Sequence, residues 1–265
     1  MIKVNGEALK TETFPNGEIK ISEFIVKNEN NISFKFHSHV DFINLLMVKN
    51  HIDENNSRSK NYLCIDYFPY SRMDRKIKGD LFTLKGMCKF INKMNFDVVY
   101  TSDNHSNVTD ALLDRNVNKS MIPLLLKEVE KEFNIDYILY PDLGALKRYR
   151  IDDYKSLVGE KVRNEQTGRI ESYEIKSSIS LKDMTILIID DLSSFGGTFA
   201  HASDKLKKLG AEKIYLAVAH CENAILDGRL LKPINGRAID KVFTTNSIID
   251  KSKETEDLMI IDIFK

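Results

Sequence analysis

The sequence predicts an α/β fold with two doubly wound domains and mainly parallel sheets. Its 265 residues, 42% of them hydrophobic, suffice for two modest cores. Short apolar runs of strand length alternate with helical patterns, which is typical of βαβ units. Several of these runs end in polar or glycine-rich loops, as expected where a parallel sheet binds a ligand. We expect domains of residues 1–117 and 118–265.

The composition limits the partners and the compartment. Lys plus Arg equals Asp plus Glu at 39 each, so no net charge attracts nucleic acid or a membrane. The sequence shows neither an apolar stretch of membrane-spanning length nor a signal-peptide pattern. The cysteines lack metal-binding spacing and suit free thiols in a reducing compartment: Cys64, Cys88 and Cys221. We therefore expect a cytoplasmic protein with no nucleic-acid or membrane partner.

Apolar patterns predict the regular elements in chain order. Residues 1–30 are expected to form short strands around a turn. Helical spacing predicts helices over Val40–Lys49, Leu84–Met94, Met121–Phe133 and Asp204–Leu209. Compact apolar runs predict strands over Asn61–Tyr67, Phe96–Tyr100, Asp136–Tyr140, Tyr173–Ile179, Lys213–Val218, Ala238–Phe243 and Leu258–Ile263.

One further strand, Ile186–Ile189, leads into the most informative loop of the chain. Asp190 and Asp191 follow this apolar run, and a helical pattern begins after the loop. The loop residues are Ser193, Ser194, Phe195, Gly196, Gly197 and Thr198. Glycines and N–H groups at a helix N-terminus suit a phosphate, and two adjacent carboxylates suit a ribose diol. A solvated turn rich in Asp and Ser is the alternative interpretation.

The segment Ile189–Thr198 resembles the phosphoribosyl-pyrophosphate loop of phosphoribosyltransferases and of ribose-phosphate pyrophosphokinases. Further motifs favour the second family, and together the resemblance covers roughly residues 14–250. It implies phosphoribosyltransferase-like folds for both domains. ATP would bind on the side of residues 1–117, and the ribose phosphate on the side of residues 118–265.

The turn Phe14-Pro15-Asn16-Gly17-Glu18 resembles the family's F-x-[ND]-G-E segment, although a simple hairpin also explains it. The resemblance implies that Phe14 stacks on adenine while Asn16 and Glu18 read its edge. In the family this site often crosses a subunit boundary. We therefore expect a homodimer or a higher homo-oligomer.

The basic stretch after the strand Asn61–Tyr67 is either a solvated loop or a phosphate-binding loop. From Tyr67 onwards it resembles the family's Y-F-x-Y-x-R-Q-D-R-K segment, with Met73 in place of the usual Gln. The resemblance implies that Arg72 grips and orients the ATP triphosphate, since a guanidinium pairs with phosphate oxygens, and that Asp74 belongs to the same site.

Two strand ends resemble the family's magnesium-binding segments. The residues Asp103-Asn104-His105 resemble its D-L-H motif, with Asn104 in place of Leu, and imply that His105 binds Mg²⁺ on ATP. The turn from Pro141 to Arg148 resembles its P-D-x-G-x-x-[KR]-R segment and implies that Asp142 holds the same ion. A structural histidine and an ordinary strand-end turn are the alternatives.

Lys161 and Arg163 occupy the place of the family's flexible K-x-R segment. Residues i and i+2 of an extended chain point to the same side, so both cations could reach a transferring phosphoryl group. A solvated pair of cations is the alternative. The resemblance implies that both residues stabilise the transition state.

The implied reaction is diphosphate transfer from Mg-ATP to the 1-hydroxyl of a ribose 5-phosphate group, with release of AMP. Relatives usually carry D-T before the glycines, where this chain has Ser194 and Phe195. The ring of Phe195 suits a larger group beyond the 5-phosphate, so ribose 5-phosphate and ADP-ribose both stay open as acceptors. A nucleobase phosphoribosyltransferase and a non-catalytic nucleotide-binding regulatory relative are the other functions that we consider.

Overall fold

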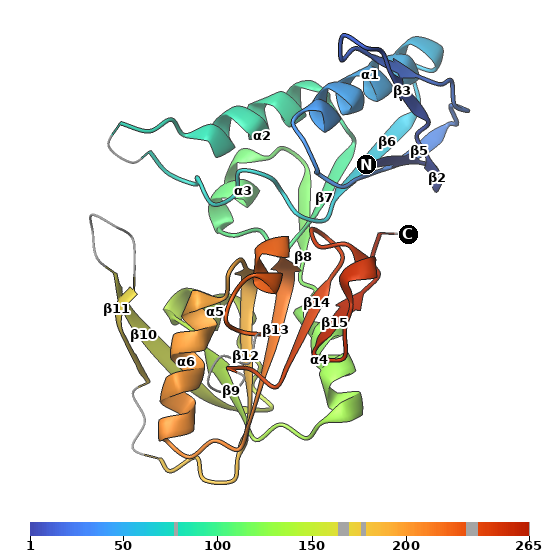
Figure 1. Cartoon of the computed structure of the whole chain (residues 1–265). Coiled ribbons are helices and arrows are strands. Elements are labelled where there is room, and N and C mark those ends of the chain that lie inside the picture. The colour runs from blue at the N-terminus through green and yellow to red at the C-terminus, as the bar shows by residue number, and fades with distance from the viewer. Residues whose placement is uncertain (77–78, 164–169, 176–178, 232–237, 265) are drawn as a thin grey trace. The chain divides into compact units, whose positions relative to one another are not determined.

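The computed structural model describes residues 1–76, 79–163, 170–175, 179–231 and 238–264, although not the side chains of 161–163 and 170–172. These residues form two compact units (Figure 1). Unit 1 comprises Met1–Lys119 together with the chain end from Phe264, and unit 2 comprises Ser120–Ile263. We describe each unit by itself.

Unit 1 is built on a mixed sheet with the strand order β2-β1-β5-β6-β7-β8. The strands from β5 to β8 are parallel, whereas β1 is antiparallel to both of its neighbours. The strands of this sheet are β1 (Ile2–Val4), β2 (Glu7–Ala8), β5 (Glu29–Phe34), β6 (Lys60–Ile65), β7 (Val98–Ser102) and β8 (Asn116–Lys119). A separate antiparallel hairpin pairs β3 (Thr11–Thr13) with β4 (Ile19–Ile21).

The helices of unit 1 are α1 (Val40–Asn55), α2 (Thr83–Lys93) and α3 (Asn107–Leu112). Alternate residues of β5 and β6, among them Phe34 and Leu63, are buried against apolar side chains of α1 and α2, such as Leu45 and Ile91. The parallel strands succeed one another in a single direction, so right-handed crossovers bring the connecting helices to one face of the sheet.

Unit 2 is built on a sheet with the strand order β11-β10-β9-β12-β13-β14-β15. Its strands are β9 (Tyr137–Tyr140), β10 (Lys155–Arg163), β11 (Ile170–Ile175), β12 (Thr185–Ser193), β13 (Lys213–Cys221), β14 (Lys241–Thr245) and β15 (Leu258–Ile261). Only β11 is antiparallel to its neighbour among these described strands. The helices are α4 (Ile122–Glu132), α5 (Leu143–Tyr149) and α6 (Gly197–Lys208), with short 3₁₀ turns η1 (Asn223–Leu226) and η2 (Lys251–Lys253).

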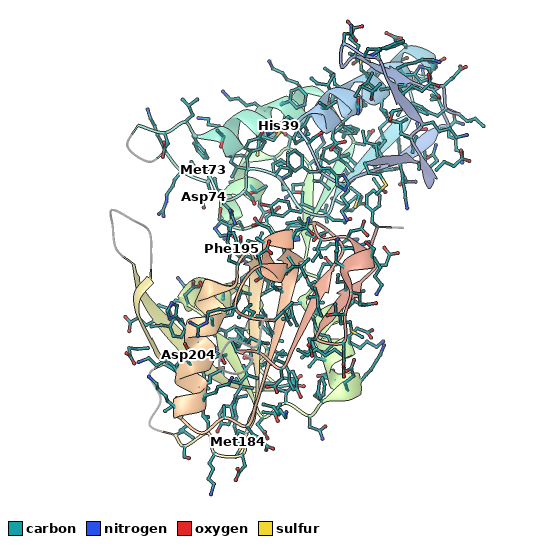
Figure 2. The ribbon with its side chains drawn as sticks, in the orientation of Figure 1. His39, Met73, Asp74, Met184, Phe195 and Asp204 are labelled. Atoms are coloured by element: carbon teal, nitrogen blue, oxygen red, sulfur yellow. The ribbon has the colours of Figure 1, made fainter. Side chains whose placement is uncertain are left out.

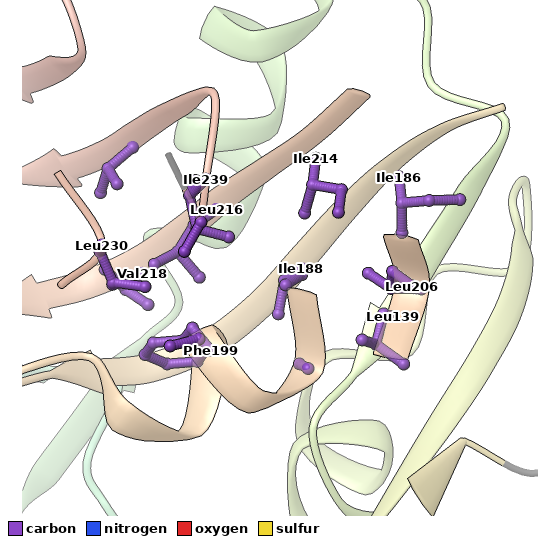
Figure 3. Packing of buried hydrophobic residues seen from close by; sticks show 14 of the residues in the cluster. Leu139, Ile186, Ile188, Phe199, Leu206, Ile214, Leu216, Val218, Leu230 and Ile239 are labelled. Atoms are coloured by element: carbon purple, nitrogen blue, oxygen red, sulfur yellow. The ribbon is translucent and has the colours of Figure 1, made fainter. Parts of the chain in front are cut away.

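Both faces of the unit 2 sheet carry an apolar core. Ile186 and Ile188 of β12 pack with Phe199 and Leu206 of α6 on one face (Figure 3). The alternate residues, such as Leu187, join side chains of α4 and α5 on the other face. Fully burying a side chain of this kind stabilises the fold by about 1.5–3 kcal/mol. Strands buried on both faces read as continuous apolar runs, which explains the sequence of β12.

The strand order of unit 2 reverses between β9 and β12. From β9 the chain passes to β10 on one side, whereas from β12 it passes to β13, β14 and β15 on the other. Ligands of open α/β sheets bind outside the carboxyl ends of the strands at such a reversal. The residues after β9 and β12 therefore occupy the place where a ligand is expected.

The predicted fold class, an α/β protein with two mainly parallel sheets, is confirmed. Several elements differ from the predicted ones, among them the strand expected at Ala238–Phe243, which lies at Lys241–Thr245. The strand expected at Tyr173–Ile179 lies at Ile170–Ile175, and residues 176–178 are outside the described part. The turn from Pro141 becomes the helix α5, and β8 (NVNK) had no apolar signal because it is an exposed edge strand. No helix in the described part of the chain is both long and apolar enough to cross a membrane.

Candidate active-site segments

The acidic pair lies near the carboxyl end of β12, in the last residues of the strand. Asp191 is buried, at 7% exposure, while Asp190 is half-buried. The backbone N–H of Asp191 donates to Asp190 Oδ1 over 2.9 Å, which holds the Asp190 carboxylate against the strand backbone. The Nη1 atom of Arg148 lies 3.5 Å from Asp191 Oδ2. The positive charge of Arg148 on α5 therefore offsets part of the negative charge of the two carboxylates that are expected to bind ribose.

Arg148 is a residue whose role sequence reasoning missed. It stands at the last position of the P-D-x-G-x-x-[KR]-R segment, but nothing in the sequence shows that it reaches Asp191. Burial lowers its pKa, but Tyr149 first, and then the charges of Asp191 and Asp190, outweigh this effect and raise the pKa above its ordinary value. The guanidinium therefore stays charged beside the acidic pair.

The loop after β12 is held by a second segment of unit 2. Gly196 has φ 78°, and a Cβ added there would lie 2.1 Å from Leu230 Cδ1. A Cβ added to Gly228 would lie 2.1 Å from the carbonyl oxygen of Phe195. Only glycine fits at these two close approaches, so the segment after η1 fixes the backbone of the loop. The sequence gives no signal for this contact, because the two segments are about 30 residues apart.

Gly197 begins α6 and is surrounded by open space. A Cβ added there would meet no atom within 4 Å. The N–H groups of the first turn of α6 have no partners within the helix, and its dipole favours an anion at this end. Phe195 projects beside them with 62% of its side chain exposed. Figure 2 shows Phe195 and Met184 at opposite ends of unit 2, since β12 runs between them.

Ser193 does not lie on the surface of this loop. It is the last residue of β12, is fully buried, and its Oγ has no hydrogen-bond partner among the described residues. Its carbonyl oxygen accepts from the N–H of Glu222 over 2.8 Å. The other two hydroxyl residues of the loop, Ser194 and Thr198, are half-buried.

Asp142 lies after β9, on the other side of the strand-order reversal. Its Oδ1 accepts from the N–H of Ala145 over 2.9 Å and caps α5. The hydroxyl of Tyr173 donates to the carbonyl of the preceding Pro141 over 3.5 Å. Burial, followed by the charges of Asp190 and Asp142, raises the pKa of Tyr173. Tyr173 is therefore a neutral phenol between the two acidic segments, a second residue that sequence reasoning missed.

Lys161 and Arg163 belong to β10 through their backbones, but their side chains lie outside the described residues. Lys161 is paired with Tyr173 of β11, and the register shifts between Val162 and Arg163. Such an irregularity interrupts the simple alternation of side chains that the sequence argument assumes. Their convergence on a phosphoryl group stays a prediction.

The residues assigned to ATP by resemblance all lie in unit 1. Phe14, Asn16 and Glu18 form the turn between β3 and β4, with Phe14 50% exposed. The N–H of Phe14 donates to the carbonyl of Glu18, and the N–H of Glu18 donates to Asn16 Oδ1. The pentad is thus a hairpin turn, as the simpler interpretation predicts, and it presents an exposed ring.

The basic stretch after β6 is only partly exposed. Arg72 is exposed and Asp74 half-buried, and Figure 2 shows Asp74 beside Met73. The N–H of Met73 donates to the carbonyl oxygen of Tyr70. The hydroxyl oxygen of Tyr70 lies 2.8 Å from His39 Nδ1. The segment therefore contains a hydrogen-bonded turn and is not an irregular loop throughout. His105 follows β7 and is exposed.

Within the described residues, no group of three or more His, Cys, Asp or Glu side chains could hold a metal ion by itself. Mg²⁺ bound with nucleotide phosphates needs only one or two protein ligands. The oxygen ligand Asp142 suits this hard cation, and the exposed His105 is accessible to it. Each donor, taken in its own unit, suits magnesium that is bound through nucleotide phosphates.

A loop suited to phosphate at a strand-order reversal, preceded by paired carboxylates, defines an α/β protein of the phosphoribosyltransferase-like class. The chain is 32% identical over 217 residues to the ribose-phosphate pyrophosphokinase of Pyrococcus furiosus, covering 78% of this chain and 73% of that relative. The chain belongs to the ribose-phosphate pyrophosphokinase family, whose members are enzymes of the ribose-phosphate diphosphokinase type.

Further comparisons agree with this family. The ribose-phosphate pyrophosphokinase of Sulfurisphaera tokodaii is 29% identical over 261 residues, covering 93% of this chain and 88% of the relative. That of Thermococcus kodakarensis is 29% identical over 191 residues, covering 70% of this chain and 66% of the relative. The crystal structure of phosphoribosylpyrophosphate synthetase from Mycobacterium smegmatis has the same fold, with a TM-score of 0.76 at 20% identity over 97% of this chain and 86% of that one. No protein-family model matches the sequence.

Proposed function

We propose that this protein transfers the β,γ-diphosphate of Mg-ATP to the 1-hydroxyl of a ribose 5-phosphate group and releases AMP. The observation that carries the proposal is the segment from Asp190 to Thr198 in a chain of this family. It combines a carboxylate pair with a helix N-terminus that opens on free space at Gly197. Acceptors for the sugar hydroxyls and donors for the phosphate thus stand side by side.

The proposed step is a displacement at phosphorus. The 1-hydroxyl oxygen forms a bond to the β-phosphorus, and the bond from that phosphorus to the α,β-bridging oxygen breaks. AMP keeps the bridging oxygen, and the hydroxyl proton passes to solvent. Mg²⁺, when bound, neutralises the phosphate charge, while the protein aligns donor and acceptor. Lys161 and Arg163 would stabilise the charge that spreads over the transferred group.

Apart from magnesium, which has one proposed ligand in each unit, each bound group has its proposed residues in a single unit. In unit 1, Phe14, Asn16 and Glu18 take adenine, and Arg72, Asp74 and His105 take the Mg-triphosphate. In unit 2, Asp190 and Asp191 hold the ribose diol, and Asp142 is the second magnesium ligand. The loop from Ser193 to Thr198 holds the 5-phosphate, through its N–H groups and the hydroxyls of Ser194 and Thr198 in particular. Unit 1 is thus the proposed ATP domain and unit 2 the proposed ribose-phosphate domain.

The acceptor is either ribose 5-phosphate or ADP-ribose. The exposed ring of Phe195 beside the loop supports ADP-ribose, because an aromatic face can stack on a second nucleotide group. The open space at Gly197 serves the 5-phosphate of either compound. The assay supplies Mg-ATP with each acceptor in turn and follows AMP release. Inactivity with both acceptors contradicts the proposal.

The variant Lys161→Ala separates an enzyme from a nucleotide-binding regulator. Removal of one transition-state contact should lower kcat by about 10²–10³-fold, while ATP binding by calorimetry stays unchanged. A protein that binds ATP but shows no turnover before or after the substitution would be a regulator. Formation of a nucleoside monophosphate and diphosphate from phosphoribosyl pyrophosphate and a nucleobase, without ATP, would instead indicate a phosphoribosyltransferase.

A further inference from the structure

The turn that carries His105 is anchored by a buried asparagine. Asn104 is 3% exposed, whereas His105 beside it is exposed. The Nδ2 group of Asn104 donates to Thr101 Oγ1 over 2.8 Å and to Asp110 Oδ1 over 2.7 Å. These bonds tie the turn back to β7 and forward to α3. The side chain before the histidine therefore points inward and the histidine outward.

Asp110 is the centre of a network of amide groups. Its carboxylate accepts from Asn104, from Asn116 Nδ2 over 2.7 Å and from Asn118 Nδ2 over 3.3 Å. The hydroxyl of Thr101 donates in turn to Asn116 Oδ1 over 3.0 Å. The bonds connect the end of β7, the first helical turn of α3 and the edge strand β8. Such connected networks rigidify the segment that they hold.

The same turn carries two energetic costs. Asp103 has φ 40°, a left-handed backbone that a residue other than glycine rarely adopts. Asn104 Oδ1 is buried without a hydrogen-bond partner among the described residues, which is unfavourable for a polar atom. Strained backbone and unsatisfied polar atoms persist where a function requires the geometry. These costs suggest that the turn is kept because it places His105 at the surface and not because it stabilises unit 1.

We propose that Asn104, held by Thr101 and Asp110, is the positioning residue that presents His105 to the Mg-ATP complex. The inference rests on the proposed role of His105. It assigns a function to the residue that differs from the family's D-L-H pattern. A leucine could anchor the turn by apolar packing, whereas the amide anchors it by two directed bonds that also fix its rotation.

A double-mutant cycle tests this coupling, with the dissociation constant of Mg-ATP as the readout, measured by calorimetry in the full chain. Asn104→Ala should weaken Mg-ATP binding about tenfold, a typical effect for residues in one network. His105→Ala should weaken it at least as much. If Asn104 acts through His105, the double variant should bind no more weakly than His105→Ala alone. Effects that multiply would overturn the proposal.

A matched control comes from the other end of the same sheet. Asn61 near the start of β6 is also 3% exposed and accepts from Asn30 Nδ2 over 3.0 Å. Asn61→Ala should lower the melting temperature without changing the Mg-ATP dissociation constant. If it weakens binding as much as Asn104→Ala does, the effect is general destabilisation and the proposal fails.

A second variant covers the case in which Asn104→Ala does not fold. Asp110 is exposed, so Asp110→Ala removes the acceptor of the same hydrogen bond with less loss of packing. It should weaken Mg-ATP binding several-fold, but only while His105 is present. Equal weakening with and without His105 would overturn the inference. Because the cycle measures binding, it can succeed even if neither acceptor supports AMP release, which would contradict only the proposed reaction.

Discussion

Gly196 and Gly197 are adjacent, but the structure requires them for different reasons. Gly196 combines a positive φ with a contact that leaves no room for a Cβ, since Leu230 fills the space. Gly197 is the first residue of α6, has no such φ, and borders open space. The first glycine therefore serves the fold of the loop, and the second leaves open the space proposed for the 5-phosphate.

Gly197→Ala should leave the melting temperature unchanged or higher, because alanine is the better helix former. The added methyl group would occupy the space proposed for the 5-phosphate, so the KM for the acceptor should rise by about tenfold or more, as expected when a phosphate loses close contact with backbone N–H groups. Steady-state kinetics and thermal melting check both results.

The matched control is Gly196→Ala, which should lower stability by roughly 1–3 kcal/mol from backbone strain, with a further loss from the clash with Leu230. Unchanged acceptor KM in Gly197→Ala would show that no phosphate sits at the start of α6.

The side chain of Phe195 offers a test between the two proposed acceptors. If its exposed ring stacks on the adenine of ADP-ribose, Phe195→Ala should raise the KM for ADP-ribose by about tenfold, given 1–3 kcal/mol per stacked base. The KM for ribose 5-phosphate should change little, since that sugar has no second ring. Parallel assays with both acceptors give the measurement, and equal effects on both would assign Phe195 to the loop itself.

At the scale of elements, β10 packs closely against β11 and the residue after β9 at Gly159, two residues before Lys161. A Cβ at Gly159 would lie 2.0 Å from the hydroxyl oxygen of Tyr173 and 2.8 Å from the carbonyl oxygen of Pro141. The three residues come from β10, β11 and the end of β9. The backbone that carries Lys161 is thereby fixed against the segment that carries Asp142.

Gly159→Ala should push β10 away from Pro141 and displace Lys161. A misplacement of about 1 Å can lower turnover about 10²-fold, so kcat should fall to that extent while Mg-ATP affinity stays near that of the unmodified chain. Gly86→Ala on α2 is the control, since its added Cβ would meet no atom within 4 Å. Full turnover in Gly159→Ala would mean that the position of β10 does not limit the reaction.

Sequence patterns predicted the long buried strands and missed several short elements, such as α3, α5 and β8. The runs of β12 and β13 are apolar throughout because both faces are covered, so their signal is strong. The segment of α5 is short and begins after Pro141-Asp142, so it looks like a turn although Asp142 is its N-cap. Local patterns register burial and turn chemistry, and they carry little information about short elements at the edge of a sheet.

Candidate residues in motifs were predictable, whereas those that act through tertiary contacts were not. Asp190 and Asp191 stand out because an apolar run ends in two charges. The contact of Arg148 with Asp191 and that of Tyr173 with Pro141 join residues 43 and 32 positions apart. Only the fold brings these pairs together. Ser193 was expected to belong to the phosphate-binding loop, but it is the last residue of β12 and its side chain is buried.

At the scale of the whole molecule, each unit should respond to its own ligand. Hydrogen exchange of the full chain with Mg²⁺ and a non-hydrolysable ATP analogue should show protection in unit 1, in the hairpin turn at 14–18, at 70–76 and at 103–106. The acceptor alone should protect residues 190–198 of unit 2, because bound ligands stabilise the segments that they contact. Protection of the acidic pair by the ATP analogue alone, with none in unit 1, would contradict the assignment of ATP to unit 1.

The packing of Leu230 and Gly228 against the loop after β12 has a thermodynamic consequence. If the packed loop keeps its shape on binding, the proposed sugar phosphate does not have to immobilise it, so the entropic cost of binding falls mainly on the small molecule. We then expect binding of the sugar phosphate to show a small change in heat capacity. Its association rate should depend little on solvent viscosity, because the loop does not have to rearrange. Leu230→Ala would remove the side chain that packs against Gly196 and make the loop more mobile. The affinity for the sugar phosphate should then fall more steeply with temperature.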